Sequence, residues 1–253
     1  MHQWLPWAIG TVAFLYAAVG HAGATGYVAV MALAGIAPAG IRPTALALNV
    51  VVALIGTVQF TRAGHQRLAL LVPLACASAP CAWLGGGLTL PGGWLEGLLG
   101  TVLALSAARQ WHDGRANHEP GDPSLALPRP LRWPGLVAIG ASVGLLSGLT
   151  GVGGGVFLTP LLLALRVAPL KTVAAVTAPF ILVNSLAGLA GGTLAAAGPI
   201  DLGEIAAAAL GGFFGSYAGA YQLPVRSLRR LLALVLGSAS VRLIVDCLTR
   251  LTS

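Results

Sequence analysis

The sequence contains very few charged residues. Charged residues make up 8% of its 253 residues and hydrophobic residues 57%, whereas soluble domains carry about 25% charged residues. The 14 basic residues are scattered over short loops rather than gathered on one face, which argues against nucleic acid as a partner. The composition therefore predicts an integral membrane protein that is embedded in the lipid bilayer, without a soluble domain.

Motifs for catalysis, cofactors and metals are also missing. The sequence has no HExxH, and its GxSxG match at residues 140–144 lies inside an apolar run without the strand-to-helix turn of a nucleophile elbow. Ser147 has no histidine in its own segment. Cys76, Cys81 and Cys247 lie in apolar segments, where small buried hydrophobes are expected instead of a disulfide or metal ligands. We expect no enzyme activity, no cofactor and no metal site. Residues 1–6 contain no Lys or Arg, so we also expect a retained first helix and no cleavable signal peptide.

Apolar runs recur along the whole chain. Many are about 17–24 residues long, the length of a membrane-spanning helix, and they do not alternate as barrel strands do. The expected fold is an all-α membrane protein, a polytopic helical bundle. The predicted segments are residues 4–20, 24–36, 44–61, 67–84, 93–110, 134–148, 155–166, 172–196, 202–222 and 229–248.

Between two of these runs, the stretch from Ser147 to Pro160 holds five glycines within Gly148 to Gly155. Glycine costs about 1 kcal/mol relative to alanine inside a helix, so this cluster needs a reason. One interpretation is a flexible or tightly packed bend between helices. Another is a nucleotide-binding loop, although no strand precedes it and no P-loop lysine follows. The third is a break within the membrane that offers backbone amides and a helix N-terminus to an anion.

The two halves of the chain look alike around this stretch. Residues 20–26, followed by Ala37-Pro38, align with residues 148–154, followed by Ala168-Pro169, when one three-residue gap is allowed. We infer a tandem duplication of about five segments per copy. A chance match between low-complexity sequences is the alternative.

Basic residues decide between a kink and a reversal at each glycine-rich bend. If each bend only kinks one long helix, the chain has eight spans and the basic residues divide nearly evenly between the two sides. If each bend reverses the chain, only Arg42 and Arg250 lie opposite the remaining loop cations. The positive-inside rule favours reversal, with both termini outside. An odd number of segments then inverts the second copy, so we expect a first repeat at 1–111, a cytoplasmic linker at 112–133 and an inverted second repeat at 134–253. Each repeat would start with a broken or re-entrant helix pair.

The bends and the helices after them supply the candidate substrate-binding residues. The segments that follow the bends extend about 18–20 Å, short of a ~30 Å hydrocarbon core, so each bend is expected at membrane depth. Free amides at helix starts there suit a small anion without a buried Lys or Arg. Polar side chains add donors, unless they bond locally or knit helices together. The candidates are Gly20, His21, Gly23, Thr25, Gly26, Asn49, Gly148, Thr150, Gly151, Val152, Gly153, Gly154, Gly155, Thr177 and Asn184, with Ser185 beside the last.

Two further features have more than one interpretation. His21 is either a proton-coupled group, an anion donor or a hydrogen-bonded packing residue. Gly211, Gly215 and Gly219 form a GxxxGxxxG stripe. Such a stripe predicts a close helix contact, either within the chain or between two copies in a homodimer.

Residues 147–160, Ser-Gly-Leu-Thr-Gly-Val-Gly-Gly-Gly-Val-Phe-Leu-Thr-Pro, followed by Ala174-Ala-Val-Thr177, closely resemble the signature of the sulfite exporter TauE/SafE family. This family is also called the 4-toluene sulfonate uptake permease family, and the resemblance extends to the length and duplicated layout of the chain. It implies a bacterial inner-membrane protein that moves sulfur-containing anions such as sulfite or organosulfonates. The first copy departs from the pattern, because His21, Thr25 and Tyr27 stand in place of glycines. We therefore expect this half to set which anion is bound.

The expected function is a secondary transporter for a small, sulfur-containing anion. The anion would bind at the midplane between the two bends while one repeat rocks against the other. The alternative is a non-transporting membrane protein, such as an assembly or sensor subunit, which would show no flux and would copurify with a partner.

Overall fold

The computed structural model describes residues 3–36, 38–88, 132–193 and 201–252, together with residues 100, 101, 103–105, 107, 108, 111 and 112. The regular structure within these residues is helical. The elements are α1 (Leu5–Ala18), α2 (Ala24–Leu33), α3 (Pro38–Arg62), α4 (Leu68–Gly86), α6 (Trp133–Thr150), α7 (Gly155–Ala164), α8 (Leu170–Gly188), the π-helical turn η2 (Leu189–Thr193), α9 (Leu202–Tyr217), the π-helical turn η4 (Ala218–Gln222) and α10 (Val225–Thr252).

The helix boundaries follow local chemistry. Pro6 and Pro134 stand in the first turns of α1 and α6, where a missing N–H leaves no hydrogen bond unmade. Asp201 caps α9, because its carboxylate accepts a hydrogen bond from the Gly203 amide at 3.0 Å. The predicted apolar segments coincide with these helices. Most of the predicted segment 93–110 and of the linker 112–133 lies outside the described residues.

Helix lengths divide the elements into two classes. Five described helices, α3, α4, α6, α8 and α10, are long and apolar enough to cross a membrane. The helices α2 and α7 have 10 residues each and so extend only about 15 Å. Large apolar side chains are exposed on the outside, such as Leu33, which is 83% exposed. A surface of this kind is suited to lipid, and the protein is a multi-pass membrane protein.

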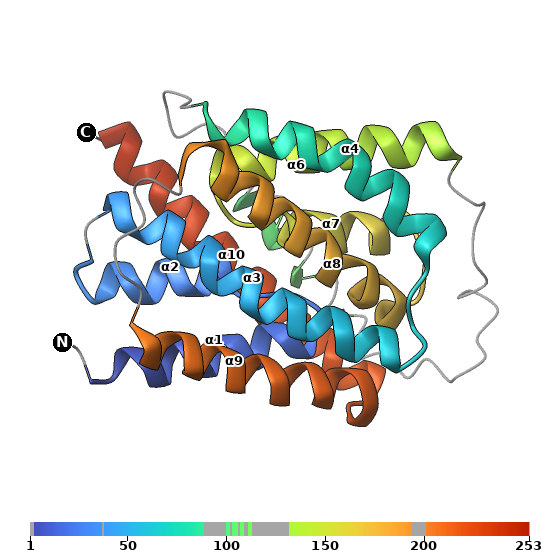
Figure 1. Ribbon diagram of the computed structural model, residues 1–253, viewed down its shortest axis with the longest axis horizontal. Helices are drawn as coiled ribbons and strands as arrows, with labels where there is room; N and C mark the ends of the chain where they lie inside the picture. The colour runs from blue at the N-terminus through green and yellow to red at the C-terminus, as the bar shows by residue number, and fades with distance from the viewer. Residues whose placement is uncertain are drawn as a thin grey trace.

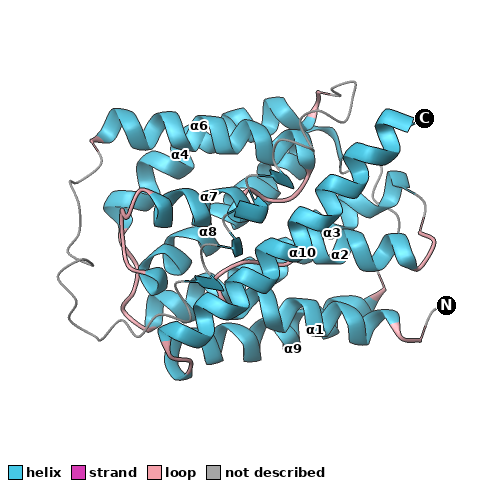
Figure 2. Cartoon of the chain, turned by 180° about the vertical axis from the view of Figure 1, so that it is seen from behind, coloured by secondary structure: helices cyan, strands magenta, loops and turns pink. Residues whose placement is uncertain are grey.

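The helices form two outer pairs with a central pair between them. Figure 1 shows α1 and α9 side by side along one edge, and α4 and α6 along the opposite edge. The view from behind in Figure 2 shows the same two pairs. Between them, α3 and α8 pack on each other, and each also contacts one outer pair, α3 through α9 and α8 through α4.

Glycine stripes allow both outer pairs to approach closely. A Cβ at Gly211 or Gly215 of α9, or at Gly219 of η4, would collide with the backbone of Gly10, Phe14 or Ala18 of α1, respectively. A second stripe on α6, Gly140, Gly144 and Gly148, lies in the same way on Leu74, Ser78 and Ala82 of α4. The GxxxGxxxG stripe predicted from the sequence is therefore a contact within the chain.

The chain turns back at the first glycine-rich bend. A Cβ at Gly26 of α2 would lie 2.5 Å from the Cγ1 atom of Val12 of α1, although 14 residues separate these positions in the sequence. In one continuous kinked helix they would be about 21 Å apart. α1 and α2 are therefore a helical hairpin.

Candidate functional site

Two glycine-rich bends interrupt the helices. The first bend, residues 19–23, joins α1 to α2, and the second bend, residues 151–154, joins α6 to α7. The backbone is left-handed at Gly20 (φ 78°) and Gly23 (φ 110°) in the first bend, and at Gly151 (70°), Gly153 (77°) and Gly154 (78°) in the second. This conformation is strained for a residue with a Cβ atom, so glycine is needed at these positions.

Each bend leaves a run of backbone amides unpaired. Within the described residues, the N–H groups of residues 22–26 and of residues 152–156 donate no hydrogen bond. Gly23 and Gly154 are the N-caps of α2 and α7 and have no side chain that could accept from these amides. The N-terminus of a helix carries a partial positive charge, so each run is suited to bind an anionic acceptor.

The two bends meet through His21. Its Nε2 atom lies 3.0 Å from the carbonyl oxygen of Gly155, the first residue of α7. Because a carbonyl oxygen can only accept, Nε2 carries the hydrogen in this contact. His21 is 3% exposed. The contact agrees with the interpretation of His21 as a hydrogen-bonded packing residue, and it joins the first bend to the helix that follows the second.

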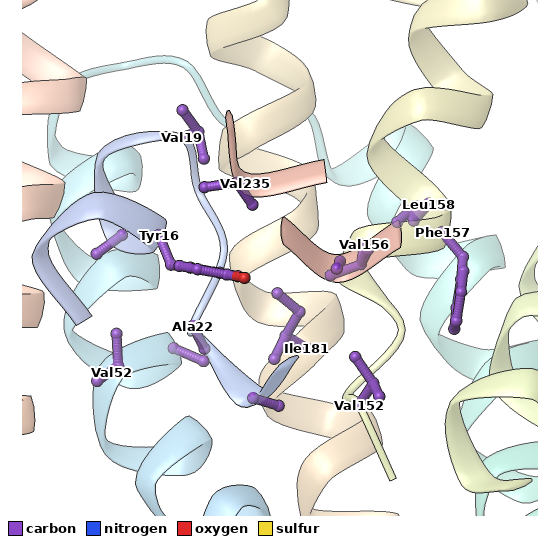
Figure 3. Close-up of a cluster of buried hydrophobic side chains, with 14 of the residues drawn as sticks. Tyr16, Val19, Ala22, Val52, Val152, Val156, Phe157, Leu158, Ile181 and Val235 are labelled. Carbon is purple, nitrogen blue, oxygen red and sulfur yellow. The ribbon is translucent and has the colours of Figure 1, made fainter. Parts of the chain in front are cut away.

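Apolar side chains surround this contact. Figure 3 shows Ala22 of the first bend, Val152 of the second, and Val156 and Ile181 from α7 and α8 in one buried cluster. The Tyr16 hydroxyl reaches into it and is hydrogen-bonded to Thr25 Oγ1 at 2.8 Å and to Ser238 Oγ at 3.2 Å. Apolar surroundings lower the local dielectric and strengthen the interaction of a charge with nearby amides.

Asn49 of α3 lies against the second bend. A Cβ at Gly153 would be 2.7 Å from Asn49 Nδ2 and 3.2 Å from the hydroxyl oxygen of Ser185 on α8. Asn49 is 1% and Ser185 0% exposed. In the described part of the chain, neither polar atom of the Asn49 side chain nor the Ser185 hydroxyl has a hydrogen-bond partner. Buried polar groups are nearly always paired in native proteins, so these two are available to a ligand.

Two other candidates on α8 have partners. The Ser78 hydroxyl of α4 donates to Asn184 Oδ1 at 2.5 Å, which orients the amide group. Asn184 Nδ2 has no partner among the described residues and remains available as a donor. The Thr177 hydroxyl is 3.0 Å from that of Thr159 on α7, so Thr177 also ties α7 to α8.

The remaining polar and glycine candidates contribute to packing. The Thr150 hydroxyl donates to the Leu146 carbonyl at 2.7 Å within its own helix. Thr25 is bonded to Tyr16, Gly148 lies on α4, and Gly26 lies on α1. These contacts hold the bends in place, and a part for these four residues in binding an anion stays a prediction.

Nearly the whole chain matches one known family. The profile of the family described as sulfite exporter TauE/SafE matches residues 7–243. The chain belongs to this family. A curated relative, the probable membrane transporter protein y4hK of Sinorhizobium fredii (strain NBRC 101917 / NGR234), is 37% identical over 239 residues, which cover 94% of this chain and 96% of that protein. No solved structure matches the chain.

Membership of the TauE/SafE family confirms the resemblance seen in residues 147–160. It identifies the protein as a membrane transporter with a small-molecule substrate. Transporters of this kind are typically not enzymes.

Sequence reasoning missed residues of this TauE/SafE protein that reach the bends from elsewhere in the fold. Ser78 orients Asn184 from α4, and Arg42 of α3 lies over Gly151. The Tyr27 hydroxyl is buried without a partner among the described residues, 3.0 Å from where a Cβ at Gly23 would stand. The sequence suggested a site without an Arg or Lys, whereas the structure places the Arg42 side chain beside Gly151 of the second bend. Tyr27 directly follows the first bend and could have been selected. No local pattern marks Ser78, and Arg42 stood out only as the basic residue that follows Ala37-Pro38, as Lys171 follows Ala168-Pro169.

Proposed function

We propose that this TauE/SafE family member is a secondary transporter for a small sulfur-containing anion of the sulfite or organosulfonate class. The anion binds near the membrane midplane, between the two glycine bends. The observation that carries the proposal is the pair of unpaired amide runs, residues 22–26 and 152–156, which the contact between His21 and Gly155 brings together. The sulfur chemistry of the substrate is inferred from the family.

The physical chemistry of the bends favours an anion over a cation or a neutral substrate. Each run of amides offers donors only, and each lies at the start of a helix whose dipole is equivalent to roughly half a positive charge there. The buried side chains of Asn49 and Ser185 can donate in addition. In apolar surroundings, such donors replace part of the hydration shell that an anion loses on entering the membrane.

We also propose that residues 1–111 and 134–253 are inverted repeats on either side of the linker 112–133. The helix contacts support this if α1 to α4 correspond to α6 to α9. The contact of α1 with α9 then corresponds to that of α6 with α4, and the contact of α3 with α9 to that of α8 with α4. The contact of α2 with α3 likewise corresponds to that of α7 with α8. Transport would occur by rocking of one repeat against the other around the fixed site.

The charge distribution supports one orientation in the membrane. With the bends as reversals, the positive-inside rule puts the linker in the cytoplasm and both termini outside. The membrane that fits a family of sulfite exporters with this topology is the bacterial inner membrane.

Flux measurements test the proposed function. The purified full-length protein is reconstituted into liposomes, and the movement of radiolabelled sulfite and of a small organosulfonate is followed over time. We expect saturable flux above that of empty liposomes, and competition between the two anions. Equal flux with and without the protein across a panel of sulfur oxyanions would refute the proposal.

A further inference from the structure

Arg42 brings a positive charge to the second bend. It lies in the second turn of α3 (Pro38–Arg62). A Cβ at Gly151 would stand 2.5 Å from its Cγ atom, 2.6 Å from Nε and 2.8 Å from Cδ. The Arg42 side chain therefore lies directly over Gly151, where the absence of a side chain leaves room for it.

The described contacts satisfy only part of the Arg42 guanidinium. Its Nη2 atom donates to the carbonyl oxygen of Gly148 in the last turn of α6. Its Nε atom is buried, and no acceptor for it lies among the described residues. Within the same part of the chain, no carboxylate pairs with Arg42. A partly buried cation without a counter-charge is costly, so an anion bound beside it would be stabilised.

Arg42 shares its helix face with Asn49. The two residues are seven positions apart, close to two full turns, so both point from α3 to the second bend. Arg42 lies at Gly151 and Asn49 at Gly153. Asn49 is 1% exposed, and both of its side-chain polar atoms lack partners among the described residues. One face of α3 thus brings a cation and an unpaired amide group to the run of free backbone amides at residues 152–156.

We propose that Arg42 binds the transported anion directly and supplies its counter-charge at the second bend. When the anion is absent, the guanidinium rests on the Gly148 carbonyl, and when the anion enters, its free N–H groups turn to the anion. A planar guanidinium forms two parallel hydrogen bonds with two oxygens of one oxyanion, which an ammonium group cannot do. Arg42 therefore favours an oxyanion over a monatomic anion. This inference rests on the proposed transport function.

A structural role for Arg42 predicts different behaviour. Basic residues often close the C-terminal end of a helix by binding its last carbonyls. Lys171, near the start of α8, provides a matched case, because its Nζ atom donates to the Ala220 carbonyl in η4 at 3.3 Å. Lys171 contacts a helix-end carbonyl as Arg42 does, but this carbonyl belongs to η4 and not to either bend. Lys171→Gln is therefore the control for removing a cation that binds a helix-end carbonyl outside the two bends.

The test compares flux through Arg42→Gln, Arg42→Lys and Lys171→Gln in proteoliposomes. We expect Arg42→Gln to raise KM for a monosulfonate about tenfold or more, the loss typical of one charge-assisted hydrogen bond. Arg42→Lys keeps the charge but not the paired geometry, so its KM should lie between those of Arg42→Gln and the wild type. In Arg42→Gln and Arg42→Lys, the ability of chloride to compete with the labelled monosulfonate should fall less than the ability of unlabelled sulfonate to do so. Lys171→Gln should keep KM within about twofold of the wild-type value.

The outcomes separate this inference from the transport function on which it rests. If the wild type moves sulfonate and a folded Arg42→Gln variant keeps the wild-type KM, the assignment of Arg42 is overturned and transport stands. If the wild type moves no sulfur oxyanion, both are overturned. Labelling of the wild-type protein with phenylglyoxal decides the case if Arg42→Gln does not fold. Sulfonate should slow modification of Arg42, read by peptide mass, but not of Arg62, which is exposed at the end of α3. Equal labelling of Arg42 with and without sulfonate would also overturn the assignment.

Discussion

The Nε2 atom of His21 and the carbonyl oxygen of Gly155 lie 3.0 Å apart, although 134 positions separate the two residues in the sequence. This hydrogen bond joins the first bend to the start of α7 and so links two elements that belong to different halves of the chain. The bond lies between the two runs of free amides. The bond therefore helps to hold the two proposed half-sites beside each other.

Removal of the His21 side chain should weaken this link. His21→Ala removes the hydrogen bond to the Gly155 carbonyl, a bond that contributes about 0.5–1.5 kcal/mol. We expect a lower thermal unfolding temperature in detergent and reduced flux in liposomes. His21→Gln retains an N–H donor and should retain more of both. The control is His65→Ala, because His65 lies in the loop between α3 and α4. Wild-type stability and flux in His21→Ala would contradict the role given to this bond.

The second bend should not tolerate a side chain at Gly153. A Cβ there would stand 2.7 Å from Asn49 Nδ2, in a backbone conformation with φ 77°. We expect Gly153→Ala to reduce flux strongly and Gly153→Leu to abolish it, with the protein still folded, because the added atoms displace Asn49 and fill the space in front of the amides.

Gly64→Ala is the matched control for this prediction. Gly64 has a similar φ of 76°, but nothing lies within 4 Å of the position that a Cβ would take there. Both substitutions introduce about 1–2 kcal/mol of backbone strain, so a difference in flux reports the contacts of the added atom with Asn49, Ile181 and Ser185 at the second bend. If Gly153→Ala transports as well as Gly64→Ala, the second bend is not the binding site.

The glycine stripe on α6 should be essential for stability. A Cβ at Gly144 would lie 2.6 Å from the Ser78 hydroxyl oxygen and 2.7 Å from Ser78 Cα. Overpacking of this kind typically costs about 1–3 kcal/mol. We therefore expect Gly144→Ala to unfold at a clearly lower temperature in detergent. Gly40→Ala, on α3 with nothing within 4 Å of the added atom, should be neutral or slightly stabilising. Equal unfolding temperatures for the two variants would contradict the prediction, because α6 could then move away from α4 without a loss of stability.

Cysteine labelling tests the proposed orientation. In a background with Cys76, Cys81 and Cys247 replaced by alanine, single cysteines are placed at the exposed residues Gln3 and His112. A membrane-impermeant maleimide added to intact cells should label Gln3→Cys. It should label His112→Cys only after permeabilisation, because the start of the linker is expected in the cytoplasm. The opposite pattern would reverse the proposed topology.

Features that depend on local sequence were predictable. Runs of apolar residues set the positions of the helices, because a helix in lipid satisfies its own backbone hydrogen bonds. The glycine cluster marked the second bend, since left-handed backbone at Gly151, Gly153 and Gly154 requires residues without a Cβ. The first bend was identified because residues 20–26 align with residues 148–154 of the second. The motif at residues 147–160 indicated the family.

The identity of the side chains that face the bends depended on tertiary structure. Most helices here are apolar on all sides, and in lipid both the packed and the exposed faces are apolar, so sequence periodicity does not show which face turns inward. Contacts such as Arg42 with Gly151, or Ser78 with Asn184, join residues more than 100 positions apart. The sequence alone determined where the chain breaks and that amides become free there. Only the packing of α3 and α8 between the two outer helix pairs decided that the breaks meet and that Arg42 and Asn49 lie beside them.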